Sequence, residues 1–116
     1  MRRQRPLVEQ GRLDDPGGPS GSVALDTPAW FTWLNAVGNT SFSYAVFDQR
    51  RGYIVGFVTV RKERRQRGGE YWTAFRRNGT RVRKRYLGRA SAVTAARLDT
   101  VAWDLYMLTP THDSLR

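Results

Sequence analysis

Hydrophobic and polar residues alternate along most of residues 40–86, and this period of two is typical of β-strands with two different faces. A first strand is expected over 42–47, and a second over 53–63 after a turn at 48–52. Short polar and Gly-containing segments separate these stretches, as they do in antiparallel sheets. The pattern therefore predicts a sheet whose strands follow one another along the chain.

The clearest local signal is Asn78-Gly79, because Asn-Gly supplies the two positive φ angles of a type I′ hairpin turn. Taking these two residues as the loop, we expect Arg76 opposite Arg81 and Phe75 opposite Val82. Successive pairs point to opposite faces of the sheet. One face then collects Tyr71, Thr73, Phe75, Val82, Lys84 and Tyr86, and the other collects Trp72, Ala74, Arg76, Arg81, Arg83 and Arg85. We expect the first set to face the core and the second, basic set to face a ligand.

Two helices flank the strands in the prediction. Thr27 or Asp26 can cap a helix that begins at Pro28 and runs to about Asn35. This helix is apolar nearly all round, which indicates either a core element or a contact surface for a protein partner or a second copy of the chain. The residues concerned are Trp30, Phe31, Trp33 and Leu34.

A second helix is expected to be capped by Ser91 and to end at about Met107. Its apolar residues recur at helical spacing, so they form one stripe that can lie on the inner side of the sheet. The stripe consists of Ala95, Leu98, Val101, Ala102 and Leu105. We expect it to lie across Val60, Tyr71, Phe75 and Val82.

Together these elements predict an α+β fold, an antiparallel three- to four-stranded sheet with the C-terminal helix packed on one face and a short N-terminal helix. Residues 1–25 are rich in Arg, Gly and Pro and are expected to be a disordered basic arm. Residues 26–107 would form a single sheet-plus-helix domain, and 108–116 a C-terminal tail.

The net charge of +10 is concentrated in one block. Residues 51–89 contain thirteen basic and two acidic residues, a surplus of eleven positive charges, so the rest of the chain is almost neutral. Arg outnumbers Lys, which favours bidentate contacts to phosphates or guanine edges, although a GC-rich genome produces the same bias. A solvated sheet face without a ligand remains the alternative, but such a face normally mixes both signs.

These features define the candidate site. Residues expected to contact bases from the basic sheet face are Arg61, Trp72, Arg76, Arg81, Arg83 and Arg85. Residues expected to contact phosphates, from the loop after the second strand and from the end of the fourth, are Arg64, Arg65, Arg67 and Arg89.

Other classes of function find little support. The chain has no cysteine, and its single histidine, His112, stands in a polar tail, so we expect no metal and no cofactor. No carboxylate pair, nucleophile beside a base or phosphate-binding loop is visible, and we therefore expect no enzyme. The lack of a long apolar stretch argues against a membrane protein and leads us to expect a cytoplasmic, nucleoid-associated one.

The segments Glu70–Arg76, Arg81–Arg85 and Tyr86–Arg89, followed by a helix, resemble the three-stranded-sheet DNA-binding domains of the integrase-arm and plant ethylene-response-factor types. The resemblance implies that the open sheet face enters the major groove, with Trp72, Arg76, Arg83 and Arg85 at DNA-facing positions. It also implies that Tyr71, Phe75 and Val82 are core positions. The chain lacks the catalytic residues of a recombinase.

The stretch Thr27–Leu34, with Val58–Arg67 and Tyr86–Arg89, also resembles a segment that opens some LuxR-type bacterial regulators. We therefore expect a bacterial transcriptional or mobile-element regulator that binds double-stranded DNA with sequence preference. Two alternatives stay open. One is an RNA or single-strand binder, and the other is a protein-interaction or antitoxin-like module.

Overall fold

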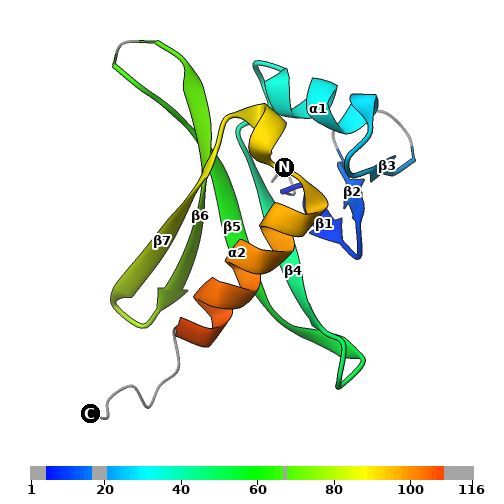
Figure 1. Cartoon of the computed structure of the whole chain (residues 1–116), viewed down its shortest axis with the longest axis vertical. Helices are drawn as coiled ribbons and strands as arrows, with labels where there is room; N and C mark the ends of the chain where they lie inside the picture. Colours follow the sequence, from blue (N-terminus) through cyan, green and yellow to red (C-terminus); the bar gives the residue numbers. More distant parts are fainter. Residues whose placement is uncertain (1–4, 17–20, 67, 109–116) are drawn as a thin grey trace.

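The computed structural model describes residues 5–16, 21–66 and 68–108 (Figure 1). It is an α+β fold with one mixed sheet in the strand order β3-β2-β1-β4-β5-β6-β7. The strands are β1 (Leu7–Glu9), β2 (Arg12–Asp14), β3 (Val23–Ala24), β4 (Ser41–Asp48), β5 (Tyr53–Arg64), β6 (Glu70–Asn78) and β7 (Arg81–Gly88). The helices are α1 (Pro28–Asn35), the short 3₁₀ helix η1 (Ala90–Ala92) and α2 (Ala95–Leu108).

The predicted fold class is confirmed, but the sheet has seven strands and is mixed, where three or four antiparallel strands were expected. The addition comes from the N-terminal segment. Strand β1 pairs parallel with β4, and β2 and β3 extend the sheet beyond β1. All other neighbouring strands are antiparallel, which was predicted for β4 to β7 and not for β1 to β3.

The expectation of a disordered N-terminal arm is wrong for its described residues, 5–16 and 21–25. Val8 and Leu13 are fully buried, and Leu25 is nearly so. The Gly- and Pro-rich composition of residues 1–25 hides these few apolar side chains. These side chains pack against the apolar face of the sheet, and their strands pair along a sheet edge that would otherwise be unpaired. The remaining arm residues, 1–4 and 17–20, lie outside the described residues, as do Arg67 and the expected tail from residue 109 to His112 and beyond.

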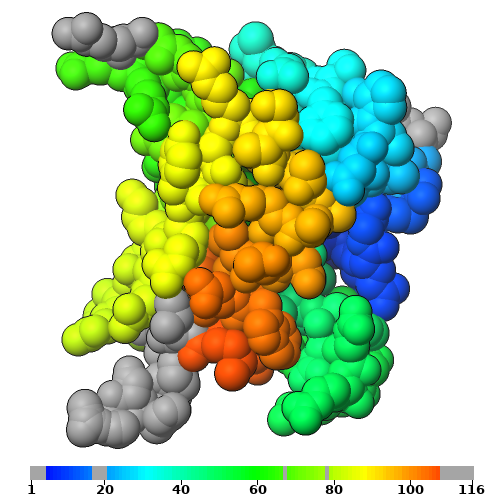
Figure 2. Space-filling view, in the orientation of Figure 1, coloured from blue at the N-terminus to red at the C-terminus, as the bar shows by residue number. Residues whose placement is uncertain are grey.

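Both helices lie on the same face of the sheet, so that one face is covered and the other is open (Figure 1). Figure 2 shows the covered face, with α2 lying across its centre. Beneath α1 the core is aromatic. The ring of Phe42 on β4 contacts Trp30 of α1 and Trp72 of β6, with ring centroids 5.6 and 5.5 Å apart.

Helix α1 has the predicted bounds and the predicted Thr27 cap. The Thr27 hydroxyl accepts a hydrogen bond from the Trp30 amide at 3.3 Å. Trp30, Trp33 and Leu34 are buried, so α1 is a core element. These three side chains are therefore not exposed to form the alternative contact surface for a partner.

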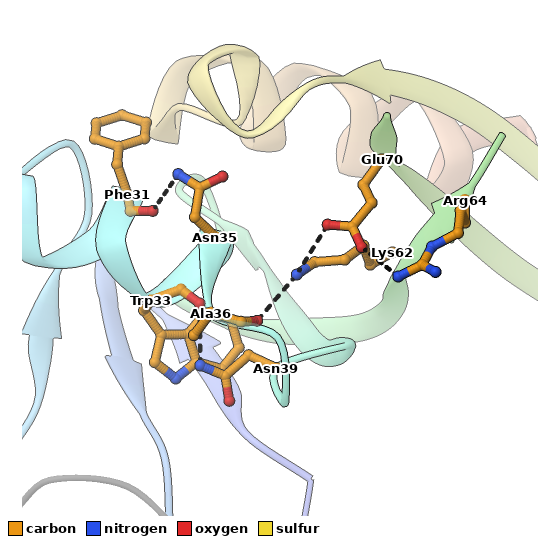
Figure 3. A network of polar contacts seen from close by, with 8 residues as sticks. All are labelled: Phe31, Trp33, Asn35, Ala36, Asn39, Lys62, Arg64 and Glu70. Atoms are coloured by element: carbon orange, nitrogen blue, oxygen red, sulfur yellow. Dashed lines mark hydrogen bonds and ion pairs between the residues drawn. The ribbon is translucent and has the colours of Figure 1, made fainter. Parts of the chain in front are cut away.

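The C-terminal end of α1 is tied to the sheet by Lys62 (Figure 3). Its ammonium group donates to the carbonyl of Ala36 at 3.1 Å and lies 3.7 Å from the Glu70 carboxylate. The Lys62 ammonium also lies 5.4 Å from the ring centroid of Trp72. A cation is favourable there because the last carbonyls of a helix carry partial negative charge.

Helix α2 begins at Ala95, and the expected cap at Ser91 is wrong because Ala90–Ala92 form η1. The first amides of α2 are instead bound by Asp26, which accepts from the Ala95 amide at 2.9 Å, and by Thr94, which accepts from Arg97 at 3.2 Å. The predicted apolar stripe is confirmed as the packed side of the helix. Leu98, Val101, Ala102 and Leu105 are buried, and Ala95 is partly buried.

The β6–β7 hairpin exists, but its turn lies one residue further along the chain than predicted, so residues 73–77 pair with partners two residues further along β7. Asn78 pairs with Arg81, so Gly79 and Thr80 form the two-residue connection, and Arg76 lies opposite Arg83 instead of Arg81. A bulge between Trp72 and Thr73 shifts the register again near the other end.

The two faces of this hairpin are inverted relative to the prediction. Trp72 and Ala74 are buried beneath the helices, whereas Tyr86 and Val82 are about half exposed on the open face. The residues predicted to share a face do so. However, the set with Trp72, which was assigned to the ligand, is on the covered face, and the set with Tyr86, which was assigned to the core, is on the open face. Strand β7 is the edge strand, so Arg81, Arg83 and Arg85 reach solvent past the side of α2 while Trp72 and Ala74 on β6 fill the space under it.

Gly88 is required by its position. It pairs with Trp72, has a φ of 120°, and an added Cβ would lie 3.1 Å from the Cβ of Ala92. We expect Gly88→Ala to lower the free energy of unfolding by about 1–3 kcal/mol, because L side chains rarely adopt this conformation. Urea titration followed by tryptophan fluorescence measures the change. Gly38→Ala is the control: a Cβ there meets nothing within 4 Å, and an equal loss in that variant would contradict the explanation.

Tyr44 predicts a sensitivity to alkaline pH. Burial, together with the charge of Asp99 and the hydrogen bond that the Tyr44 hydroxyl donates to it, raises the pKa of Tyr44 above its ordinary value. The unfolded chain therefore loses this proton first, and stability should fall as pH rises above about 10, by up to about 1.4 kcal/mol per pH unit. Tyr44→Phe should lose less stability than the wild type between about pH 9 and pH 11 in urea titrations. Identical slopes would show that Tyr44 does not contribute.

Candidate nucleic-acid interface

The open face of β5, β6 and β7 carries a strip of aromatic and basic side chains, which we call the open-face strip. Neither helix covers it, because α1 and α2 both pack on the other face. Cross-strand pairing fixes its order, with Thr59 opposite Phe75, Phe75 opposite Lys84, and Thr73 opposite Tyr86. The strip consists of Phe57, Thr59, Arg61 and Glu63 from β5, Tyr71, Thr73, Phe75 and Arg77 from β6, Val82, Lys84 and Tyr86 from β7, and Arg65 from the following loop.

Aromatic rings are accessible along this strip. Phe57 is 53% exposed and Tyr86 49%, and Phe75 and Tyr71 are partly buried. Tyr71 and Tyr86 contact each other, with ring centroids 5.4 Å apart. Large apolar side chains clustered on an exposed surface mark a site of interaction, whereas single ones need no explanation.

Three rings of the strip, those of Phe75, Tyr71 and Tyr86, each have a cationic side chain beside them. The guanidinium of Arg61 lies 5.1 Å from the centroid of Phe75, and the ammonium of Lys84 lies 5.5 Å from the same ring. The guanidinium of Arg65 lies 4.8 Å from the ring of Tyr71 and 5.9 Å from that of Tyr86. These contacts hold positive charge at the ring faces, within the range of cation–π attraction.

The electrostatic balance of the strip is positive. Among the strip residues defined above, Glu63 is the one carboxylate, and it accepts a hydrogen bond from the Thr73 hydroxyl at 3.2 Å. Arg5, from the segment before β1, reaches the strip as well and donates to the Thr59 hydroxyl at 3.4 Å. An unbalanced positive surface with exposed rings is suited to phosphates and bases.

The structure separates the residues predicted to contact bases. Arg61 lies on the open face, and Trp72 is 1% exposed in the core. Arg76 is held on the covered face, where it donates to the carbonyl of Phe57 at 3.1 Å and lies 5.0 Å from the ring of Tyr106. Arg85 is bound to Asp104 of α2 at 3.2 Å.

Arg81 and Arg83 belong to a different surface, the free edge of the sheet. A shallow hollow of about 430 Å³ follows this edge and is lined by residues Arg81 to Arg85. Charges along an edge strand also prevent it from pairing with another sheet. The predicted basic residues are thus divided among the open face, the free edge and the covered face, and do not form one continuous plane.

The predicted phosphate-contacting residues also differ in their surroundings. Arg64 is exposed and paired with Glu70 at 3.2 Å, whereas Arg65 stands over the tyrosine rings of the strip. Arg89 is exposed just after β7. Arg65 and Arg89 line one common hollow, and Arg67 lies outside the described residues.

Sequence reasoning missed the aromatic members of the strip, Phe57, Tyr71, Phe75 and Tyr86, and with them Lys84. Alternation held no signal that could have found them, because both faces of the inner strand β6 carry large rings. Tyr71 and Phe75 stand on the open face, and Trp72 stands on the covered one.

Other kinds of site find no geometry in the described part of the chain. No group of three or more His, Cys, Asp or Glu side chains is placed to hold a metal ion there. None of the helices in that part combines the length and apolar character needed to cross a membrane.

Comparison with protein-family models, with curated proteins and with solved structures found no match to the chain. The resemblances suggested by the sequence therefore stay predictions, and the open-face strip is interpreted from its own chemistry.

Proposed function

We propose that this protein binds single-stranded nucleic acid on the open-face strip of β5, β6 and β7. The observation that carries the proposal is the alternation of accessible rings with cations on an uncovered sheet face. Bases stack on aromatic rings with little regard to sequence, and cations between the rings bind the phosphates. A duplex keeps its bases stacked inside, so a flat strip of rings offers it little.

The strip places residues for base stacking next to residues for phosphate binding. Phe75 lies between Arg61 and Lys84, so a base stacked on its ring would place its phosphates beside two positive charges. Tyr86 repeats the arrangement with Arg65. Because the strip has one carboxylate, Glu63, repulsion of a polyanion is small.

Duplex DNA binding is the second candidate, favoured by the basic hollow along the β7 edge. Arg81 and Arg83 could contact phosphates or base edges there, in the manner predicted for a transcriptional or mobile-element regulator. Two of the base-reading residues predicted from the sequence are already bound within the protein, Arg76 to the Phe57 carbonyl and Arg85 to Asp104. A third, Trp72, is buried, which makes the duplex the weaker candidate.

Removing rings from the strip should weaken binding to single strands. We expect Phe75→Ala and Tyr86→Ala each to cost about 1–3 kcal/mol of binding free energy, roughly a 5- to 150-fold rise in Kd, because each removes one stacking platform. Anisotropy titration of a labelled oligonucleotide measures the change, with thermal melting to verify folding. Tyr53→Ala removes an equally exposed tyrosine outside the strip and should leave Kd unchanged. Unchanged affinity in both strip variants would refute stacking on this face.

Two matched double variants distinguish the two candidate surfaces. Arg61→Ala with Lys84→Ala removes two charges from the strip, and Arg81→Ala with Arg83→Ala removes two from the β7 edge. For single strands, the first pair should weaken binding more and reduce the salt dependence by about 0.7 per lost phosphate contact. Competition between single-stranded and duplex oligonucleotides at equal salt completes the test. Preferred binding of the duplex, abolished by the second pair alone, would favour the edge.

A further inference from the structure

A small hollow of about 260 Å³ lies at one end of the open-face strip. The loop between β5 and β6 forms one side of it, and the end of β7 forms the other. Its lining includes Arg65, Gly68, Gly69, Tyr71, Tyr86 and Arg89. Two guanidinium groups therefore border one enclosure, next to the last pair of rings in the strip.

Arg65 is held in place by the protein. Its guanidinium stands over the rings of Tyr71 and Tyr86 and donates to the Tyr86 hydroxyl at 3.4 Å. The loop that carries it is closed by two backbone hydrogen bonds, from the Arg65 amide to the Gly69 carbonyl and from the Gly68 amide to the Arg65 carbonyl, each 3.1 Å long. Positioning by rings and by a closed loop reduces the entropy lost when Arg65 binds an anion.

Arg89 approaches from the opposite side. A Cβ added to Gly69 would lie 3.7 Å from its guanidinium nitrogen, which places this group beside the glycine backbone. Within residues 5–16, 21–66 and 68–108, the Arg89 guanidinium has no hydrogen-bond or ion-pair partner. Its charge therefore faces the hollow without compensation.

The single carboxylate at the hollow does not neutralise these charges. One oxygen of the Glu70 carboxylate lies 3.7 Å from the Lys62 ammonium, and the other lies 3.2 Å from the Arg64 guanidinium (Figure 3). Two cations thus share one anion before Arg65 and Arg89 are considered. The hollow retains a positive surplus that an anionic ligand can balance.

We propose that this hollow binds the terminal phosphate of a single-stranded nucleic acid whose bases lie on the open-face strip. This inference rests on the function proposed above. A phosphate monoester carries nearly two negative charges at neutral pH and three strong acceptor oxygens, which match two guanidinium groups. An internal diester carries one negative charge and therefore balances less of the positive surplus of the hollow.

Oligonucleotides of one sequence, ending in a 5′-phosphate, a 3′-phosphate or hydroxyl groups alone, test the proposal by isothermal titration at constant salt. We expect a phosphate on one of the two ends to lower Kd by about fivefold or more, as a charge-assisted pair of hydrogen bonds should. Arg89→Ala should abolish this gain, so that strands with and without a terminal phosphate bind this variant with similar Kd. Arg50→Ala, which removes an exposed arginine far from the hollow, should preserve the gain.

The gain should also decrease below about pH 6, where the phosphate monoester takes up its second proton while arginine stays charged. Equal Kd values for all three ends would overturn the terminal-phosphate site and leave single-strand binding intact. Failure of every strand to bind at low salt would overturn the function proposed for the strip as well. A gain that survives in Arg89→Ala would exclude this hollow as its source.

Discussion

The aromatic cluster of Trp30, Trp33, Phe42 and Trp72 determines which face of the sheet is available. Trp30 and Trp33 stack with ring centroids 5.9 Å apart, and Phe42 joins both of them to Trp72 across two layers. Rings of this size dominate the apolar area that a small domain can bury. Because α1 brings two of them to the side where Trp72 already points, that side becomes the core and the other face stays open.

Polar contacts around the aromatic cluster also hold α1 on the covered face of the sheet. The indole of Trp30 donates to the carbonyl of Val93 at 2.8 Å, and that of Trp33 donates to Asp15 at 2.8 Å. The first bond connects α1 to the segment before α2, and the second connects it to the N-terminal strands. In the described residues no buried side-chain nitrogen or oxygen is left without a partner. The indole groups therefore join sheet, helix and N-terminal segment without the cost of an unsatisfied buried donor.

The sequence predicted the elements well and their surroundings less well. Alternation located the four long strands, and capping and helical spacing located α1 and most of α2, because these signals are local. The identity of the core face is decided by contacts between distant segments, such as Trp30 with Val93, and alternation alone is symmetric between the two faces. Assigning Trp72 to the ligand followed from its arginine neighbours on β7, which reach solvent only because β7 is an edge strand.

The short N-terminal strands escaped prediction for a related reason. Strand β3 has two residues and β1 and β2 have three each, too few to show a period. Their stability comes from pairing with one another, from the pairing of β1 with β4, and from burial of Val8 and Leu13. The average composition of residues 1–25 is dominated by the surrounding Gly, Pro and Arg, so it predicted disorder. Tertiary contacts of this kind override local propensity in strands more readily than in helices.

The open face combines two properties that a protein surface usually keeps apart, exposed rings and uncompensated charge. Cations at the ring faces explain why both can persist. Arg61, Lys84 and Arg65 cover the π surfaces of Phe75, Tyr71 and Tyr86, so the rings are partly shielded from water and from association with other apolar surfaces. A nucleic acid would replace this shielding with bases and move the same cations to its phosphates, so the contacts that shield the rings in the free protein are also the ones that a polyanion can use.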